Sequence, residues 1–416
     1  MNVLKIATAG SVDDGKSTLI GRILYDTQSL TDDKLEAIRE KSKQRGFDYL
    51  DFSLATDGLV AEREQGITID VAHIYFSTPK TSFIIADTPG HIEYTRNMVT
   101  GASNSAASIV LVDARNGVVE QTYRHFFINN LLRVPNVIIA INKMDLVDFS
   151  EDKFEQIKGE ISYLAAKSNF SEQQLHFIPI SALHGDNVVE KSARIDWYHG
   201  PSLLEYLEEV AAVSKEEEAG VARFPVQTVI RPKTEEYHDF RAYAGKLYGG
   251  DIEVGDEVSV LPSGTTSKVK SIHFFDQEYQ WARKGSSITL TLEDDVNISR
   301  GDLLVKSETP PTVTKSFEAT VCWMDKAALT PGAKFYIKHG VTDAQAKITS
   351  LDSVIHTDFS GATPTPTALE LNQIGKVQIK VSKPLAVDAY EQHKANGAFI
   401  LIDPKTNNTS GVGFIQ

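Results

Sequence analysis

A glycine-rich octapeptide behind the first apolar run constrains the fold of this chain more than any other feature. Residues 3–9 have the composition of a buried strand, and the sequence GSVDDGKS follows at residues 10–17, ahead of a helix-like stretch. Glycines at this spacing let the backbone curl so that its N–H groups and the next helix N-terminus point at phosphate oxygens. Lys16 then neutralises phosphate charge, and the Ser17 hydroxyl reaches Mg²⁺. The octapeptide therefore predicts a nucleoside-triphosphate site rather than an ordinary glycine turn.

The first half of the chain alternates strand-like and helix-like stretches. This alternation predicts an α/β domain with a mostly parallel sheet and helices on both faces. The charged sequence SKEEEAG at residues 214–220 is typical of a solvated connector, so we expect the first domain to span residues 1–220. We expect its strands at residues 3–9, 82–86, 108–112, 136–142 and 175–180, and its last helix at residues 203–213.

Short alternating strands separated by Gly and Pro turns follow this domain. They are typical of β-barrels, and Pro310 and Pro311 mark a break between two of them. We expect one barrel at residues 221–311 and a second at residues 312–416. The sequence TPTPT at residues 363–367 predicts a stiff loop in the second barrel, a spacer rather than a docking motif.

Composition narrows the class of protein. The net charge of −14 disfavours binding to nucleic acid, and no apolar run is long enough to span a bilayer. The N-terminus carries no export signal, so we expect a cytoplasmic location without membrane contact. Cys322 is the single cysteine, which excludes an internal disulfide and a Cys-cluster metal site, and the histidines lack zinc-type spacing. Mg²⁺ is the only metal that the sequence implies.

Asp87 comes directly after the second predicted strand, in the sequence DTPG. It therefore emerges at the carboxyl end of that strand, beside the phosphate loop, where Mg²⁺ needs a second oxygen ligand. The Gly90 backbone N–H can approach a γ-phosphate because no side chain intervenes. This tetrapeptide alone is weak evidence for a nucleotide site. It becomes stronger evidence because it follows the phosphate loop in the chain, directly after a strand of its own.

The sequence NKMD at residues 142–145 follows another predicted strand and identifies the base. Asp145 can accept hydrogen bonds from the N1–H and 2-amino groups of guanine, which adenine does not offer. Asn142 is expected to brace the loops and the Lys143 stem to lie along the base. Backbone N–H groups of Ser181, Ala182 and Leu183 are expected to meet the guanine oxygen. These residues predict GTP as the ligand rather than ATP.

The chain resembles the translational GTPases of the elongation factor Tu group over all three predicted domains. The sequence EREQGITI at residues 62–69 is similar to the first switch of that group, which implies that Thr68 caps Mg²⁺ and the γ-phosphate. Gly90 and His91 resemble the glycine and histidine of the second switch, which implies that His91 orients the attacking water as the catalytic residue. Val12 and Ile67 resemble the apolar pair that holds this histidine back until a partner moves it.

Several stretches are more similar to one branch, the large GTP-hydrolysing subunit of two-subunit bacterial sulfate adenylyltransferase. Membership implies that a small catalytic partner subunit joins sulfate to the AMP part of ATP, releasing pyrophosphate, while GTP hydrolysis here drives adenylyl sulfate formation. The expected assembly is a heterodimer or larger, and no second phosphate loop appears after Ser17. The stretches are residues 10–17, 57–72, 94–103, 185–189, 258–264, 323–325 and 399–403.

Two departures and two alternatives accompany this resemblance. Ile92 stands where the family more often has a polar residue, which bears on how the second switch meets its partner. The chain also ends near its second barrel, so a fused adenylyl-sulfate kinase is not expected. A translation factor that delivers aminoacyl-tRNA is the first alternative, but the segment RPKTEE at residues 231–236 mixes charges and offers no basic stripe. A purely regulatory GTP-binding protein is the second.

The predicted site has four groups of residues. The catalytic residue is His91, the metal ligands are Ser17, Thr68 and Asp87, and the apolar gate is formed by Val12 and Ile67. The GTP-binding residues are Gly10, Ser11, Val12, Asp13, Asp14, Gly15, Lys16, Ser17, Thr18, Thr68, Asp87, Gly90, Asn142, Lys143, Asp145, Ser181, Ala182 and Leu183.

Overall fold

The computed structural model describes most of the chain. Its described residues are 3–44, 46, 49–55, 71–88, 95–168, 170, 172–213, 220–232, 240–275 and 277–416. The chain divides into two compact units, residues 1–217 with 357–361, and residues 218–356 with 362–416. An α/β sheet lies in the first and two barrels lie in the second, which confirms the predicted fold class.

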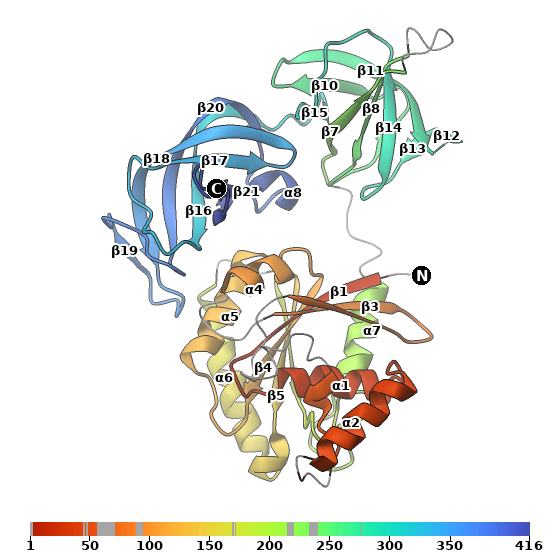
Figure 1. The fold of residues 1–416 in the computed structure, drawn as a ribbon, viewed down its shortest axis with the longest axis vertical. Helices are drawn as coiled ribbons and strands as arrows, with labels where there is room; N and C mark the ends of the chain where they lie inside the picture. The colour runs from red at the N-terminus through yellow and green to blue at the C-terminus, as the bar shows by residue number, and fades with distance from the viewer. Residues whose placement is uncertain are drawn as a thin grey trace. The chain divides into compact units, whose positions relative to one another are not determined.

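A six-stranded sheet forms the centre of the first unit, in the order β2-β3-β1-β4-β5-β6 (Figure 1). Only β2 runs antiparallel, against β3, and the other neighbours are parallel. The edge strand β2 was not among the predicted strands, because four of its six residues are exposed and its apolar run is short. The strands are β1 (Val3–Ala9), β2 (Ala72–Ser77), β3 (Ser82–Asp87), β4 (Ala107–Asp113), β5 (Asn136–Asn142) and β6 (Gln174–Pro179).

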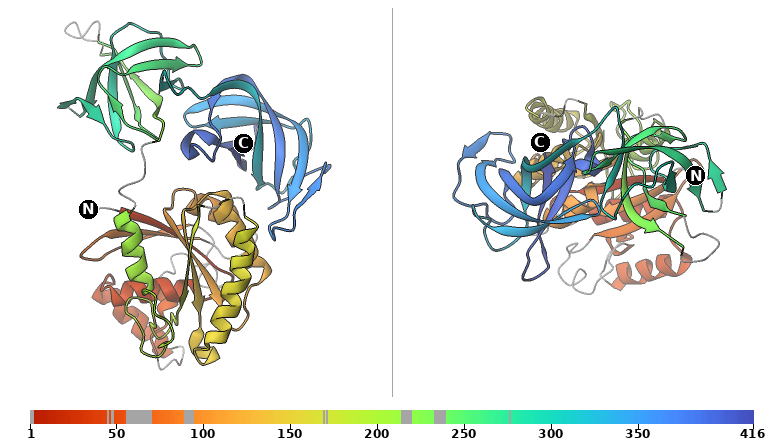
Figure 2. Two further views of the ribbon diagram at one scale, coloured as in Figure 1. Left: turned by 180° about the vertical axis from the view of Figure 1, so that it is seen from behind. Right: turned by 90° about the horizontal axis from the view of Figure 1, so that it is seen from above.

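Helices cover both faces of this sheet, as its buried parallel strands require. Every residue of β4 is buried. Apolar residues of α1 and α7 share one core with Ile6, Ile109 and Ile138, and Figures 1 and 2 show α4, α5 and α6 on the opposite side. The helices are α1 (Lys16–Asp26), α2 (Asp32–Gln44), α4 (Thr95–Ala102), α5 (Glu120–Leu131), α6 (Glu151–Ala166) and α7 (Leu203–Val213), with short turns η1 (Phe52–Ala55) and η3 (Met144–Val147).

The first barrel closes because β10 pairs with both β15 and β11, giving the ring β10-β15-β7-β8-β14-β11. Its inward residues alternate with exposed ones along β11, the pattern of a barrel wall with one wet face. The strands are β7 (Arg223–Ile230), β8 (Ala242–Lys246), β9 (Ile252–Glu253), β10 (Glu257–Leu261), β11 (Thr265–Phe274), β12 (Gln277–Tyr279), β13 (Trp281–Ala282), β14 (Ser287–Leu292) and β15 (Leu303–Lys306).

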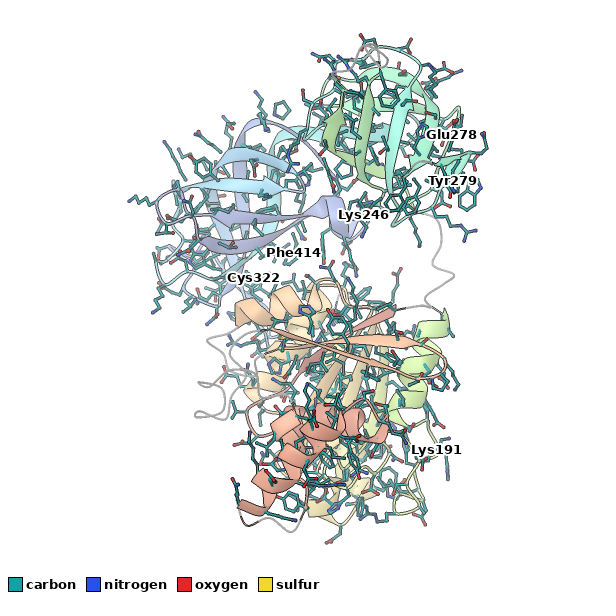
Figure 3. All side chains as sticks on the ribbon, turned by 45° about the vertical axis from the view of Figure 1, so that its right-hand side comes forward. Lys191, Lys246, Glu278, Tyr279, Cys322 and Phe414 are labelled. Atoms are coloured by element: carbon teal, nitrogen blue, oxygen red, sulfur yellow. The ribbon has the colours of Figure 1, made fainter. Side chains whose placement is uncertain are left out.

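The second barrel closes in the same way, through pairing of β17 with β18. The single cysteine, Cys322, lies on β16 of this barrel (Figure 3), and burial raises the pKa of its thiol to about 12. The elements are β16 (Thr312–Trp323), β17 (Lys334–His339), β18 (Thr342–Ile355), β19 (Ala362–Pro364), β20 (Ile374–Val387), α8 (Lys394–Gly397), β21 (Ala398–Ile402) and β22 (Thr409–Ile415).

The stretch predicted as a stiff loop at residues 363–367 begins as a strand. Thr363 and Pro364 belong to β19, which pairs with Val354 and Ser353 of β18. Proline is tolerated there because β19 lies at the open end of the strand order, where no further neighbour requires its missing N–H. The proline-based expectation of a loop is therefore wrong for the first two residues.

The two barrels are joined inside their unit by a buried ion pair. Arg223 of β7 donates from Nε to Asp388 Oδ2 at 2.8 Å and from Nη2 to Asp388 Oδ1 at 2.9 Å. Asn396 Nδ2 also donates to Asp388, at 2.8 Å. Beside this pair, Leu303 and Val305 of the first barrel pack against Ala386 of the second. Polar and apolar contacts thus both hold the barrels together.

Among the described residues, no helix is long and apolar enough to cross a membrane.

Candidate functional site

Four neighbouring strands end in polar side chains at one edge of the sheet. Thr8 of β1 lies in register with Asp87 of β3, and Asp113 of β4 lies in register with Asn142 of β5. β1 stands between β3 and β4, so the connections on its two sides leave the sheet in opposite directions. In a parallel sheet, such a point opens a crevice beyond the carboxyl ends of the strands where ligands bind. The candidate site lies at this edge.

The phosphate loop joins β1 to α1 with two residues in the left-handed region. Asp13 has φ +70° and Gly15 has φ +91°. A Cβ on Gly15 would lie 2.5 Å from Nδ2 of Asn142, so this position requires glycine for both space and conformation. The Gly15 carbonyl accepts from Leu19 N at 2.9 Å and starts α1 immediately after the loop. The N-terminal end of α1 therefore lies directly beside the loop and the crevice.

Lys16 holds its ammonium at the end of β3. Its Nζ lies 3.4 Å from Asp87 Oδ1 and donates to the carbonyl oxygen of Thr88. The side chain is only 8% exposed, which places a buried cation next to a buried carboxylate. Such a cation is suited to neutralise the charge of a phosphate that enters the loop.

The oxygen donors beside Lys16 fit Mg²⁺. Asp87 is buried and its Oδ1 accepts from Thr8 Oγ1 at 3.2 Å, while Ser17 lies in the first turn of α1. Carboxylate and hydroxyl oxygens are the hard ligands that Mg²⁺ takes, and this ion keeps several waters and phosphate oxygens besides one or two protein ligands. Within the part of the chain that the structure describes, no group of three or more His, Cys, Asp or Glu forms a metal cage. The two donors suit a metal that arrives with a phosphate.

Asn142 bridges the phosphate loop and the loop of residues 181–183. Its Nδ2 donates to the carbonyl oxygen of Asp14 at 2.7 Å, and its Oδ1 accepts from Ala182 N at 2.9 Å. Asn142 and Ala182 are buried. One side chain thus sets the distance between the loop that faces phosphates and the loop expected to face a base.

Asp145 lies at the far end of this bridge. Its Oδ1 accepts from Ser181 Oγ at 2.6 Å, and its Oδ2 lies 3.8 Å from Nε2 of His184. The side chain is 14% exposed, so the carboxylate is fixed yet reachable. Both oxygens retain lone pairs for further donors. A ring with two adjacent N–H donors could therefore bind there.

Lys143 connects the two ends of the site along its floor. The residue has φ +62°, and its Nζ donates to the carbonyl oxygen of Asp13 and lies 2.9 Å from Asp113 Oδ2. Burial would raise the pKa of Asp113, but hydrogen bonds from Arg115 and Lys143 outweigh it and hold the pKa at about 2. Asp113 was missed from the sequence, although it ends its strand as Asp87 does, because no tetrapeptide motif follows it.

Two titratable groups, Asp14 of the phosphate loop and His125 on α5, have shifted pKa values. Asp14 is one of the predicted GTP-binding residues, whereas His125 was not predicted from the sequence. Burial raises the pKa of Asp14 to about 6, although the Ser11 N–H donates to its Oδ2 at 2.6 Å. Burial lowers the pKa of His125 on α5 to about 3, and the charges of Lys16 and Arg124 lower it further. His125 is therefore a neutral imidazole behind the loop. The sequence gave no signal for His125, because this residue lies far from any motif.

The remaining predicted residues divide into two groups. Val12 is 42% exposed, and Ser17 and Thr18 are half-buried. Ile67, Thr68, Gly90 and His91 lie outside the described residues, as does Ile92. The structure therefore brings together the phosphate-loop residues, Asp87 and the base residues of the prediction, while Thr68 and the other switch residues stay predictions from sequence.

Comparison with known protein families gives two matches. Residues 1–213 match the model of the elongation factor Tu GTP binding domain, and residues 316–416 match that of the GTP-eEF1A C-terminal domain-like family. Among solved structures, the Saccharomyces cerevisiae Ski7 GTPase-like domain is 18% identical, with a TM-score of 0.55, and the match covers 100% of this chain and 97% of that one. At that identity the likeness concerns the fold.

Curated relatives match the chain over its whole length. The bifunctional enzyme CysN/CysC of Mycobacterium tuberculosis is 49% identical over 414 residues, which cover 99% of this chain and 67% of that protein. Sulfate adenylyltransferase subunit 1 of Bacteroides fragilis is 48% identical over 416 residues, which cover 100% of this chain and 86% of that protein. The subunit of the same name from Teredinibacter turnerae is 46% identical, with coverage of 99% and 86%.

Proposed function

The chain belongs to the family of sulfate adenylyltransferase subunit 1, and we propose on that premise that it is the GTPase subunit of this enzyme. In this role it hydrolyses GTP to drive formation of adenylyl sulfate and pyrophosphate from ATP and sulfate on a partner catalytic subunit. The observation that carries the proposal is the Asn142 bridge, which joins a phosphate loop to a loop beside Asp145. A site for ATP would have no use for the Asp145 carboxylate at the base end, because adenine lacks the N1–H and 2-amino donors of guanine.

GTP binding follows from the two ends of the site. At one end, the backbone of residues 10–15 and the buried Lys16 ammonium receive the phosphates, with Thr18 in the first turn of α1. At the other end, Asp145 accepts from guanine N1–H and the 2-amino group, and the Leu183 N–H meets the guanine 6-oxygen. The Ser181 and Ala182 N–H groups, which the sequence also suggested for this role, donate instead to Asp186 and Asn142. Adenine would leave the Asp145 carboxylate without these donors. This loss can favour GTP over ATP by a factor of about 10⁴ or more.

Mg²⁺ is the proposed cofactor, held by the Ser17 hydroxyl and, through water, by Asp87. When bound, it neutralises charge that develops on the phosphates. Thr8 Oγ1 and Lys16 Nζ both contact Oδ1 of Asp87, which holds the carboxylate in place before any nucleotide binds. Thr68 is proposed as the third ligand on the strength of its sequence motif.

Hydrolysis itself is assigned to His91, which orients the attacking water in the manner its sequence context implies. Val12 and Ile67 hold this histidine away until a partner acts, so we expect slow hydrolysis by the chain alone. The exposure of Val12 at 42% supports a side chain that can pack against an incoming segment. The reaction then waits for the catalytic subunit.

The division of labour between subunits is part of the proposal. The name of the relatives, subunit 1, implies a second subunit, and we place the sulfate chemistry there, in a heterodimer or larger assembly in the cytoplasm. Delivery of aminoacyl-tRNA is not supported, because relatives that are 45–48% identical over the chain carry the name sulfate adenylyltransferase subunit 1. Nucleic acid is not a proposed partner.

Co-purification with an enzymatic readout tests the function. The chain is expressed with its candidate small subunit, captured through a tag, and assayed for sulfate-dependent pyrophosphate release with and without GTP. We expect stimulation by GTP, none with Lys16→Ala, and normal stimulation with Lys41→Ala, an exposed lysine on α2. A captured complex that releases pyrophosphate at the same rate without GTP would overturn the proposal.

A further inference from the structure

Arg22 of α1 links two segments that lie far apart in sequence. Its Nε bonds to Asp26 Oδ2 at 2.7 Å, one turn further along the helix. On the other edge of the guanidinium, Nη1 donates to the carbonyl oxygen of Leu183 at 3.3 Å. Leu183 belongs to the loop of residues 181–183, so α1 contacts the base end of the site as well as the phosphate end.

The Arg22 guanidinium also packs directly against the turn that closes this loop. Gly185 has φ +85°, and its N–H donates to the carbonyl oxygen of Ser181 at 2.7 Å. A Cβ on Gly185 would lie 2.5 Å from Nη2 of Arg22, so the guanidinium occupies the space beside this glycine. Ser181 in turn donates to Asp145. The guanidinium therefore supports the loop that carries the Ser181 contact to Asp145.

Aromatic rings hold the face of the same guanidinium. Its carbon lies 5.4 Å from the centre of the Phe52 ring and 5.9 Å from that of Tyr25, and the two rings are 5.1 Å apart. Phe52 is only 4% exposed, and a Cβ on Gly21 would lie 2.1 Å from its carbonyl oxygen. η1 thus rests directly on α1 at the position of Arg22.

We propose that Arg22 is a positioning residue for the guanine base, and that Phe52 fixes Arg22 in turn. The role rests on the proposed GTP site and deepens it. Arg22 holds the Leu183 carbonyl, and with it the Leu183 N–H, where the 6-oxygen of guanine meets it. Phe52 belongs to the last described element before residues 56–70, which contain Thr68. The base end of the site is thereby coupled to the chain that leads into the first switch.

The geometry needs arginine rather than any cation. A planar guanidinium can bond to Asp26 at one edge and Leu183 at the other while its face lies on a ring, whereas a lysine ammonium is a single point charge. Loss of one such charged hydrogen bond and its ring contact changes a dissociation constant by about tenfold or more. We therefore expect Arg22→Lys to behave more like Arg22→Ala than like the native chain.

The test measures the rates at which nucleotides dissociate from the full chain. A fraction of misfolded protein does not affect these rates, because only protein that has bound nucleotide contributes to them. Arg22→Ala and Arg22→Lys are compared with Arg39→Ala, an exposed arginine on α2 that pairs only with Glu36 in the described structure. One ligand is guanosine diphosphate, and the other is 6-thioguanosine diphosphate, which keeps the N1–H and 2-amino donors but carries a weakly accepting sulfur in place of the 6-oxygen. We expect both Arg22 variants to release guanosine diphosphate about tenfold faster, to change release of the analogue much less, and Arg39→Ala to match the native chain.

Equal acceleration for both nucleotides would overturn the role, because a general loosening of the fold does not depend on the 6-oxygen. Unchanged release of guanosine diphosphate would overturn it as well. A double-mutant cycle of Arg22→Ala and Phe52→Leu tests the coupling: we expect the double variant to release guanosine diphosphate no faster than Arg22→Ala, and additive effects would contradict the link to Phe52. Failure of the proposed GTP site is distinct, since the native chain would then bind no guanine nucleotide, and failure of the proposed role in sulfate activation would not alter the guanine nucleotide release expected of these variants.

Discussion

The side-chain amide of Asn142 donates a hydrogen bond of 2.7 Å to the backbone carbonyl oxygen of Asp14. This contact spans 128 residues and ties β5 to the phosphate loop. The other end of the amide accepts from the Ala182 N–H, so a single buried group serves both ends of the site. The phosphate half and the base half are thus one structural unit.

Asn142→Ala should weaken GTP binding by about 10- to 100-fold, because a buried N–H and a buried carbonyl each lose their partner. Calorimetric titration with GTP measures the change. Asn130→Ala is the matched control, since Asn130 also bonds through its side chain, to Gln173 at 2.9 Å, but away from the site. Equal losses in the two variants would contradict the bridging role.

Asp145→Asn should exchange the preferred base from guanine to xanthine, because the side chain then offers a donor where it offered only acceptors. We expect the ratio of GTP to xanthosine triphosphate affinity to fall by about 10³-fold or more. Competition between the two nucleotides gives this ratio. Asp148→Asn, at an exposed position in the left-handed region, should leave it unchanged. An unaltered ratio in Asp145→Asn would remove Asp145 from base recognition.

Asp14→Asn should change how stability depends on pH. Burial raises the Asp14 pKa from 3.8 to about 6, so the favourable contribution of its proton is complete below pH 3.8 and lost as the pH rises through about 6. The variant carries no charge and escapes this loss. We expect its unfolding free energy to equal that of the native chain near pH 4 and to exceed it by roughly 1–3 kcal/mol at pH 7. A constant difference across this range would contradict the assignment.

Asp388→Ala should destabilise the barrel unit by about 3–5 kcal/mol, because it leaves the Arg223 guanidinium charged and buried without a partner. Glu318→Ala is the control, since its pair with Lys376 is exposed and is expected to contribute less than about 1 kcal/mol. Burial would raise the Asp388 pKa, but hydrogen bonds from Arg223 and Asn396 lower it. This stability is therefore present above the ordinary aspartate pKa and lost as the pH falls through the lowered one. Equal melting temperatures for the two variants would contradict the assignment.

His91→Ala should preserve GTP affinity and slow the partner-stimulated hydrolysis of GTP strongly, because the attacking water loses its orienting imidazole. Single-turnover hydrolysis in the presence of the catalytic subunit separates this step from binding. An undiminished stimulated rate would take His91 out of the mechanism.

The sequence predicted the residues that follow buried strands in short motifs. Asp87, Asn142 and Asp145 each stand at or just after the carboxyl end of a strand, and parallel strands bring those ends to one edge. The barrel strands were predictable for a related reason, because inward and outward residues alternate along them, as in β17. The local sequence pattern was sufficient to predict strands with alternating burial and the motifs that follow buried strands.

What the sequence did not predict depends on contacts between distant segments. Arg22 meets Leu183 across 161 residues, and Arg223 meets Asp388 across 165 residues, with no motif at either arginine. Asp113 carries no tetrapeptide of its own, and Pro364 lies in a strand because that strand is at an edge. The roles of these residues depend on tertiary packing, and local residue type and spacing do not reveal which distant segments pack together.

The most direct test of the central claim measures how far adenylyl sulfate formation proceeds, rather than how fast. The complex of this chain with its catalytic subunit is supplied with ATP, sulfate and a fixed pyrophosphate concentration, with and without GTP, and adenylyl sulfate and guanosine diphosphate are quantified together. We expect adenylyl sulfate to accumulate beyond its equilibrium level only while GTP is hydrolysed, and Lys16→Ala to abolish the excess. The same final level of adenylyl sulfate with and without GTP would contradict the coupling of the two reactions.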